Sequence, residues 1–315
     1  MTPTLNAGKY VEDAIRCVEA QHYVNHEHII VDGGSTDSTI SLLRKYEHLR
    51  GFRWMSEPDL GIYDAINKGL RMSNGEIQSF LSADDLYPPW SLGRVVEAFS
   101  RDTSVDIVYG DGMIAALGGK YAVIYFNPPE LGLKSFLKIN TPATNPFFWK
   151  RRVFEEIGGY DINYRIAGDY DFIARAVPRF KFTRVEEVLT LWRFRPQSTT
   201  SDREGVVDEN SEINRKTGGI FSRERLPLVY ARLAARYIRD SYPEFARFAL
   251  VCFAKEDQGR YGNLVGSRSV SRPRLLRDVL VPLLPLFLLT TRMRTRFFPG
   301  YIRTATLREF LYSSP

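Results

Sequence analysis

The sequence predicts an α/β fold, in which helices cover both faces of a mostly parallel sheet. Short apolar runs with β-branched residues alternate with segments whose apolar residues recur at helical spacing. The chain has 315 residues, of which 44% are hydrophobic, so it can bury a full core. Polar motifs directly follow the predicted strands, and ligands of such sheets bind beyond the carboxyl ends of the strands. We therefore expect the functional residues at that edge.

The alternation is regular over the first 111 residues. Strands are expected at 28–31, 52–56, 76–81 and 106–111. Helices are expected at 8–21, from a cap at Ser35 or Thr36 to about residue 46, at 62–72 and at 90–100. Beyond residue 111 we expect short strand-like stretches, a segment interrupted by prolines, a helix near 169–177 and largely helical structure over 205–256.

Composition excludes several classes of protein. The two cysteines, Cys17 and Cys252, are too few for a disulfide framework and lack C-x-x-C spacing, which fits a reducing compartment. No secretory signal is expected, because no basic segment followed by an apolar run opens the chain. From residue 265 onward nine arginines stand against two acidic residues, which accounts for the whole net charge of +6. A nucleic-acid binder would carry its basic residues on the folded domain, so no nucleic-acid partner is expected.

The basic tail brackets an apolar run. Residues 279–289 are far fewer than the ~20 that a membrane-spanning helix needs, and they include Pro282 and Pro285. Arginines on both sides favour a segment that lies in the interface of an anionic leaflet. The alternative is a helix packed on the protein's own surface. We expect a cytoplasmic protein that is peripheral on the inner face of the plasma membrane.

The first polar motif is VDGGSTD, residues 31–37, which lies between a strand and a helix. Asp32 can accept hydrogen bonds from a base or a ribose, and Gly33 and Gly34 permit a tight turn. The helix that follows presents free N–H groups to a ligand. Alternatively, the motif is an ordinary Asp-Gly turn without a ligand.

The second motif is SADDLYPP, residues 82–89, which places Asp84 beside Asp85 after a strand. Neighbouring like charges are unfavourable unless a cation or hydrogen-bond donors offset them. A Mg²⁺ or Mn²⁺ ion that bridges two phosphates needs only one or two protein carboxylates. Alternatively, the two carboxylates cap a helix before Pro88.

The third motif is GIYDAINKG, residues 61–69, in which Asp64 and Lys68 share a helix face with Asn67 beside them. Lys68 could face a phosphate, or the pair could be ordinary surface chemistry. In a fourth motif Asp169 and Asp171 open a helix, where Asp169 could act as a general base or only as a helix cap. Farther on, Arg193 and Arg195 are candidate contacts to a diphosphate.

Together these motifs resemble the family 2 glycosyltransferases. The matching segments are TPTLN at 2–6, VDGGSTD at 31–37, EPDLGIYDAINKG at 57–69, SADDLYPP at 82–89 and GDYDF at 168–172. The resemblance covers about two thirds of the chain. It implies a GT-A fold, a nucleotide-diphosphate sugar donor that is commonly UDP-linked, and a divalent metal, Mg²⁺ or Mn²⁺, bound through a DXD-like element.

The resemblance also implies roles for single residues. Asp169 would be the catalytic base, and Asp85 would bind the metal together with Asp84. The nucleotide would be bound by Pro3, Thr4, Asn6 and Asp32, with Asp84 against the nucleotide or the metal. Gly34 and Ser35 of the first motif and Asp64, Asn67 and Lys68 of the third are further candidates for this nucleotide site, because of their place in the predicted sheet. The implied parts are a GT-A domain at 1–200 with a nucleotide-binding half (1–110) and an acceptor half (111–200), a helical extension at 201–264 and a membrane-associating tail at 265–315.

The chain departs from the family pattern in three places. The family's opening strand normally lies before TPTLN, so this strand is expected to be missing here. Ser82 stands where many relatives carry an acidic residue. No histidine lies near residues 193–201 to complete a metal shell.

The sequence therefore predicts an inverting glycosyltransferase that moves a sugar, from a UDP-sugar in particular, to a hydroxyl of a saccharide or lipid-linked acceptor. Synthesis of surface polysaccharide or lipopolysaccharide would be its setting. A nucleotide-sugar-binding protein without turnover is the main alternative, motivated by the strand expected to be missing. A dinucleotide-dependent oxidoreductase is disfavoured because the G-x-G-x-x-G spacing is absent, and a nucleotidyltransferase because no glycine-rich basic loop opens the chain.

Overall fold

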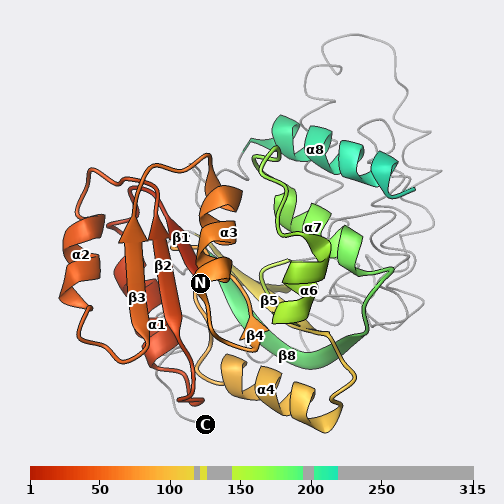
Figure 1. The fold of residues 1–315 in the computed structure, drawn as a ribbon, viewed down its shortest axis with the longest axis horizontal. Coiled ribbons are helices and arrows are strands. Elements are labelled where there is room, and N and C mark those ends of the chain that lie inside the picture. Colours follow the sequence, from red (N-terminus) through yellow and green to blue (C-terminus); the bar gives the residue numbers. More distant parts are fainter. Residues whose placement is uncertain (117–120, 126–143, 194–201, 219–315) are drawn as a thin grey trace, which may run out of the picture. The chain divides into compact units, whose positions relative to one another are not determined.

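The computed structural model describes residues 1–116, 121–125, 144–193 and 202–218. These residues form two sheets, each accompanied by helices (Figure 1). The first sheet has the order β1-β2-β3 and is parallel throughout, with β1 (Thr2–Thr4), β2 (His28–Asp32) and β3 (Phe52–Ser56). Three helices accompany it: α1 (Val11–Glu19), α2 (Thr39–Lys45) and α3 (Ile62–Met72). The predicted α/β class is confirmed.

Helices cover the first sheet on both faces, because alternate residues of a strand point to opposite sides. Ile30 of β2 packs with Ile15 of α1 and Leu43 of α2. Its neighbours Ile29 and Val31 pack instead with α3. All five residues of β2 are therefore buried, as expected for a strand between two helical layers.

The second sheet follows the order β4-β7-β5-β6, and β8 also pairs with β5. Its strands are β4 (Ile77–Gln78), β5 (Ile107–Ala116), β6 (Tyr121–Tyr125), β7 (Phe147–Lys150) and β8 (Phe182–Arg193). The β5–β8 pair is parallel, whereas β4–β7, β5–β7 and β5–β6 are antiparallel. Four helices belong to this part: α4 (Ser91–Arg101), α6 (Arg151–Ile157), α7 (Gly168–Ala176) and α8 (Arg203–Lys216).

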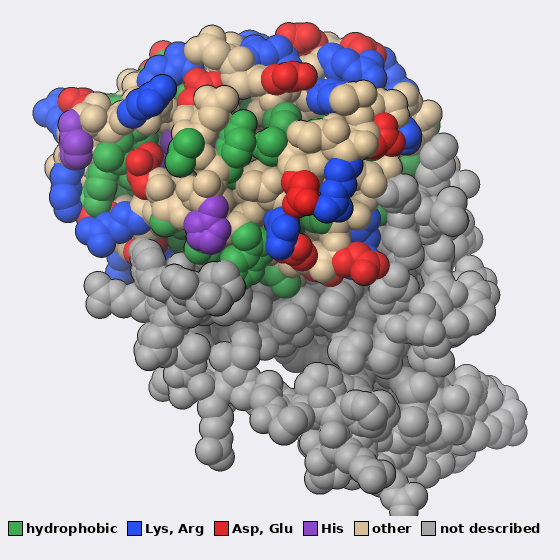
Figure 2. Space-filling view, turned by 90° about the horizontal axis from the view of Figure 1, so that it is seen from below, with side chains coloured by type: hydrophobic (Ala, Val, Ile, Leu, Met, Phe, Trp, Pro, Cys, Tyr) green, Lys and Arg blue, Asp and Glu red, His purple; other side chains and the backbone are tan. Residues whose placement is uncertain are grey.

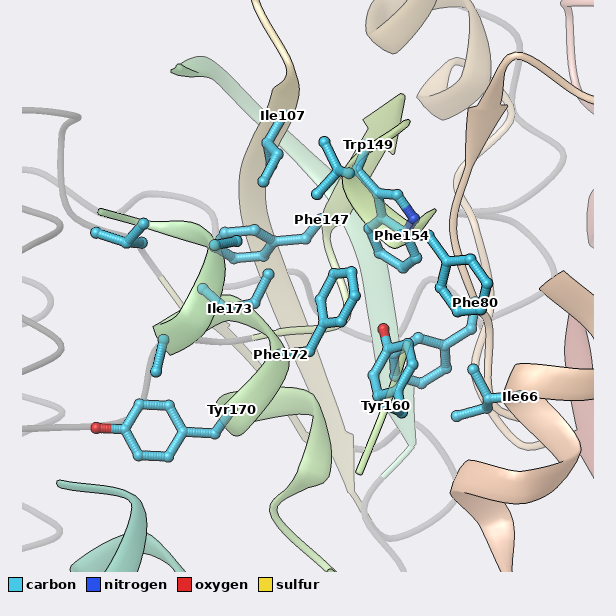
Figure 3. Packing of buried hydrophobic residues seen from close by; sticks show 14 of the residues in the cluster. Ile66, Phe80, Ile107, Phe147, Trp149, Phe154, Tyr160, Tyr170, Phe172 and Ile173 are labelled. Carbon is cyan, nitrogen blue, oxygen red and sulfur yellow. The ribbon is translucent and has the colours of Figure 1, made fainter. Parts of the chain in front are cut away.

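An aromatic core lies between α3, α7 and the second sheet (Figure 3). Tyr160 stacks on Phe172 of α7 with ring centroids 4.5 Å apart, and Phe80 meets Tyr160 edge-on at 5.8 Å. Trp149 of β7 packs against Phe172 at 5.0 Å. Residues from 1–110, predicted to be the nucleotide-binding half, and residues from 111–200, predicted to be the acceptor half, pack together in this core.

The expectation of a missing opening strand is wrong, because residues Thr2–Thr4 form β1. The strand pairs with β2 on one side. On the other side the Met1 carbonyl accepts a hydrogen bond from the Leu81 N–H (2.9 Å), and the Met1 amino group donates to the Ser79 carbonyl (2.9 Å). Backbone hydrogen bonds of Met1 and β1 thus lie on both sides of this short segment. Strand β4 ends at Gln78, short of the predicted residue 81, although Ser79 and Leu81 still bond to the backbone of Met1.

Most predicted elements are present, with shifts at their ends. The strand at 52–56 and the helix at 62–72 have the predicted bounds. The second helix begins at Thr39, not at Ser35 or Thr36, because the Asp37 carboxylate accepts the Thr39 N–H (2.9 Å). Helix α8 confirms part of the helix expected at 205–256. The rest of that segment and the tail at 265–315 lie outside the described residues, so the division into parts at residues 200 and 264 stays a prediction.

Charged side chains of both signs are interspersed on the described part of the face in Figure 2. Many charges on the described surface form pairs, and helix α4 provides an example. Arg94 bonds to Glu97 at 3.1 Å and to Glu187 at 3.0 Å. None of the helices in the described part of the chain is both long and apolar enough to cross a membrane.

Candidate active site

The carboxyl ends of the three parallel strands bring Thr4, Asp32 and Ser56 side by side. Asp32 is fully buried, and its Oδ1 accepts a hydrogen bond from the Thr4 hydroxyl (3.0 Å). Its Oδ2 accepts hydrogen bonds from the Ser56 hydroxyl (2.7 Å) and from the Gly34 and Ser35 N–H groups (3.0 and 2.9 Å). Burial alone would raise the pKa of Asp32, but the donors of Ser35, Ser56 and Thr4 hold this pKa below its ordinary value.

Asp32 therefore shapes the VDGGSTD loop. Its carboxylate is occupied by donors of the chain, so direct contact with a base or ribose stays a prediction. Gly34 has a φ of 89°, in the left-handed region that the tight turn requires. Pro3 is buried inside β1 opposite Val31, one residue short of the sheet edge.

Asn6 joins the loop after β1 to the loop after β2. Its N–H donates to the Ser35 hydroxyl (2.7 Å), and its Oδ1 accepts the Thr36 N–H (2.9 Å). Asn6 is exposed and has a φ of 50°. Of the residues predicted to bind the nucleotide, Thr4, Asn6, Asp32, Gly34 and Ser35 thus meet at one edge of the sheet.

Asp64 and Lys68 share one face of α3, as predicted. The Lys68 ammonium lies 3.1 Å from Asp64 and 2.9 Å from Glu57. Asp64 in turn accepts the Leu60 N–H at 3.1 Å. The pair therefore anchors the loop between β3 and α3.

That loop lies against the turn after β2. A Cβ atom added to Gly33 would come within 2.5 Å of an oxygen of Asp59. Sequence reasoning did not single out Asp59, although it stands in the EPDLG segment that follows a strand. Its position places a carboxylate directly beside the predicted nucleotide-binding turn.

The side chain of Asn67 is engaged in the core, which disfavours its predicted contact with the nucleotide. Its side chain is buried, its amide donates to the Tyr160 carbonyl (2.8 Å), and its Oδ1 accepts the Tyr160 N–H (2.9 Å). The reason is helical spacing: Asn67 lies four residues after Tyr63, on the buried face of α3. Tyr63 itself donates its hydroxyl to the Ile166 carbonyl at 2.6 Å. This face of α3 therefore holds the segment that leads to Asp169.

Asp85 is buried, while Asp84 is half-buried beside it. Asp85 Oδ1 accepts the Arg193 N–H (3.1 Å), and Oδ2 accepts the Asn145 amide (2.9 Å). Burial, followed by the charge of Asp84, raises the pKa of Asp85 well above its ordinary value. Helix α4 begins only at Ser91, so the alternative that these carboxylates cap a helix is excluded.

The carboxylate pair fits a hard divalent cation. Two buried or half-buried carboxylates repel each other, and Mg²⁺ or Mn²⁺ would offset that charge through oxygen ligands. In the described ranges no group of three or more histidine, cysteine, aspartate or glutamate side chains comes together to hold a metal. Phosphate oxygens and water would then complete the coordination, as such ions commonly accept.

Asp169 lies in the first turn of α7 and remains partly accessible. The Thr144 hydroxyl donates to its Oδ2, and the Tyr170 N–H donates to its Oδ1 at 2.8 Å. Burial raises the pKa of Asp169 above its ordinary value, although the Thr144 bond lowers it. The cap position of α7 belongs to Ala167, so Asp169 is not the capping residue. Asp171 is engaged with Arg175 at 2.7 Å.

Thr144 and Asn145 were missed by sequence reasoning. They lie just before β7, separated from it by Pro146, and the contacts that reveal their role reach 25 and 60 residues along the chain. The sequence shows only a polar pair before a buried aromatic strand, and this pattern does not predict which residues the pair contacts. Neither residue could therefore be assigned to the site from the sequence.

Arg193 contributes its backbone to the site and its side chain to α1. The guanidinium bonds to Asp13 at 3.0 Å and lies over the Tyr10 ring at 5.2 Å. A diphosphate would have to displace these contacts, which disfavours the predicted role of Arg193. Arg195 lies outside the described residues.

Residues 1–158 match the family described as Glycosyl transferase family 2. Over 171 residues the chain is 37% identical to an uncharacterized glycosyltransferase of Mycobacterium tuberculosis. This match covers 53% of the chain and 63% of the relative, so the chain spans less than two thirds of that protein's length.

Solved structures share the fold. The mannosyltransferase PcManGT from Pyrobaculum calidifontis, in complex with GDP-Man and Mn²⁺, matches 92% of this chain and 81% of its own, with a TM-score of 0.56 and 19% identity. S. aureus TarS 1–349 in complex with UDP-GlcNAc matches 83% of this chain and 90% of its own, with a TM-score of 0.55 and 15% identity. These likenesses confirm the predicted GT-A fold.

Proposed function

Because the chain belongs to the family 2 glycosyltransferases, we propose that it is an inverting enzyme that moves a sugar from a nucleotide-diphosphate donor to an acceptor hydroxyl. The observation that supports this most is the anchoring of two carboxylates by consecutive residues. Thr144 bonds to Asp169, and Asn145 bonds to Asp85. The proposed base and the proposed metal-binding carboxylate are thus both held by one dipeptide. Such a link fixes their relative positions, which a displacement with the base on one side of C1 and the metal on the other requires.

The chemistry follows from these positions. Asp169 takes the proton of the acceptor hydroxyl, whose oxygen attacks C1 of the donor sugar. The bond from C1 to the diphosphate breaks on the opposite face, so one displacement inverts the anomeric centre. A divalent metal held by Asp85 and Asp84 would stabilise the charge that develops on the leaving diphosphate. The raised pKa of Asp169 brings the base closer to neutral pH, where it accepts a proton more readily.

The donor is proposed to be a UDP-sugar. Thr4, Asn6 and Ser35 lie together at the sheet edge where such a nucleotide would bind. TarS binds UDP-GlcNAc, whereas PcManGT binds GDP-Man, so both bases belong in a test. The sugar itself depends on the shape of the pocket and not on the shared motifs.

The test is release or transfer from a panel of UDP-, GDP- and dTDP-sugars with Mn²⁺. Wild type is compared with Asp85→Ala and Asp169→Asn. We expect metal-dependent release from one donor that both substitutions abolish. Donor binding by calorimetry without any release would support the alternative, a binding protein without turnover, although the presence of β1 removes the observation that motivated it.

The acceptor is proposed to be a saccharide or lipid-linked saccharide used for surface polysaccharide or lipopolysaccharide, at the cytoplasmic face of the plasma membrane. The arginines around residues 279–289 support this proposal. Flotation of the full chain with vesicles of anionic or neutral lipid tests it. We expect the chain to float with anionic vesicles only, and to sink when Arg272, Arg274 and Arg277 are changed to Glu. A chain that sinks with both vesicle types would contradict the membrane role.

A further inference from the structure

Helix α8 packs along the segment that leads into α7. Its Gly205 lies so close to Ile166 that an added Cβ atom would come within 2.7 Å of the Ile166 side chain. Asn214 donates a hydrogen bond to the Tyr170 hydroxyl, and Lys216 donates to the Tyr164 hydroxyl at 3.0 Å. The contacts of α8 thus bracket Asp169 in the sequence on both sides.

Glu209 stands at the centre of this contact. Its Oε1 accepts the Arg165 N–H at 2.9 Å. Its Oε2 accepts the N–H groups of Ile166 (2.9 Å) and Ala167 (2.7 Å). Three consecutive backbone donors therefore converge on one carboxylate, two residues before Asp169. Hydrogen bonds to an ionised acceptor are stronger than neutral ones, so this arrangement fixes the backbone firmly.

The fixed turn sets the position of the first turn of α7. The Ala167 carbonyl accepts the Asp171 N–H at 3.0 Å, so α7 begins from the residue that Glu209 holds. From the other side the Tyr63 hydroxyl bonds to the Ile166 carbonyl at 2.6 Å. Asp169 is thus carried on a segment held by α3 and by α8.

We propose that Glu209 is a positioning residue for Asp169. It does not touch the reacting atoms. It fixes the backbone of Arg165, Ile166 and Ala167, so that the Asp169 carboxylate meets the acceptor hydroxyl in a productive geometry. Helix α8, which lies beyond the residues matched by the family, is accordingly part of the catalytic unit. The inference rests on the proposed role of Asp169 as the base.

The first test is hydrogen exchange in the full chain. Glu209→Gln keeps the shape of the side chain, but its amide nitrogen cannot accept a hydrogen bond. We expect exchange at the three amides of Arg165, Ile166 and Ala167 to become at least about ten-fold faster. The matched control is Glu212→Gln, on the same helix, where the carboxylate pairs with Lys216 at 2.7 Å. Equal exchange in wild type and Glu209→Gln would overturn the proposal, whether or not sugar is transferred.

The second test separates positioning from general stability. With the donor that wild type uses, Glu209→Gln should lower kcat about ten-fold and leave the donor KM within about two-fold, because the base acts after the donor binds. Glu209→Asp, which keeps the charge but is shorter, should recover part of kcat, and Glu212→Gln should match wild type. An unchanged kcat in Glu209→Gln, or an effect on KM alone, would overturn the positioning role.

The two tests also separate the inference from the proposed function. A wild type that transfers from no donor would refute the base role of Asp169 and with it the catalytic meaning of Glu209. An active wild type with an equally active Glu209→Gln variant would refute only the inference. Thermal unfolding of each variant shows whether it folds, and Glu209→Asp provides the comparison if Glu209→Gln does not.

Discussion

The Thr144 hydroxyl donates a hydrogen bond to Asp169 Oδ2, across 25 residues of sequence. Thr144 is buried, whereas Asp169 remains partly accessible. A hydrogen bond to the ionised form of a carboxyl lowers its pKa, and here it opposes the stronger effect of burial. Thr144 thus tunes the group that we propose as the base as well as orienting it.

Thr144→Val should shift the pH dependence of transfer to higher pH. The variant keeps the shape of the side chain but loses the donor, so the pKa of Asp169 rises further. Because the base works only when ionised, the acid limb of the kcat profile should move up by about one pH unit. Thr144→Ser, which keeps the hydroxyl, is the control. A shift to lower pH would show that Thr144 does not act on Asp169 in this way.

Asn145→Ala should lower the affinity for the metal, although Asn145 bonds to the proposed ligand Asp85 and not to the ion itself. Asn145 donates to Asp85 Oδ2 at 2.9 Å, and loss of such a supporting bond typically costs 10–100-fold in metal affinity, so a change of about ten-fold is expected. The measurement is the Mn²⁺ concentration that gives half of the maximal rate. Asn163→Ala, in an exposed loop, should leave it unchanged. An unaltered Mn²⁺ requirement in Asn145→Ala would argue against Asp85 as a metal ligand.

Local patterns in the sequence predict some features of the fold and the site, whereas long-range contacts are not predictable from them. The bounds of α3 were predictable because Tyr63, Ile66 and Leu70 repeat at helical spacing. The partner of Asn67 was not, because Tyr160 lies 93 residues away and no local pattern names it. The site carboxylates were found because each follows a strand or opens a helix. What holds them, Thr144 and Glu209 above all, depends on tertiary contacts that a single sequence does not reveal.

Asn67→Ala should destabilise the protein without weakening donor binding. The substitution leaves the buried N–H and carbonyl of Tyr160 without their partner, at a cost of about 2–3 kcal/mol in the free energy of unfolding. Urea unfolding measures this cost, and calorimetry of the folded variant measures donor affinity. The exposed Asn74→Ala serves as the control. A variant with unchanged stability and weaker donor binding would restore Asn67 to the nucleotide site.

Asp32→Asn should lower stability at neutral pH by about 2 kcal/mol, because an amide cannot accept all the hydrogen bonds that the carboxylate of Asp32 receives. The pKa of Asp32 in the folded chain lies below its ordinary value of 3.8. The stabilisation by the ionised carboxylate is therefore fully present above pH 3.8 and is lost as the pH falls through the lower, folded-state pKa. Urea unfolding of wild type and variant should give curves that converge in acid.

The matched control for Asp32→Asn is Asp208→Asn, an exposed aspartate on α8, whose stability should follow wild type at every pH. Unfolding at neutral pH alone would not separate a lost charge from a lost shape, because both lower the free energy of unfolding. A pH series separates the two effects, because the carboxyl group of Asp32 titrates and the amide of the variant does not. The opposite result would be a difference in the free energy of unfolding between wild type and Asp32→Asn that widens toward acid pH. It would mean that burial raises the pKa of Asp32 more than the surrounding donors lower it.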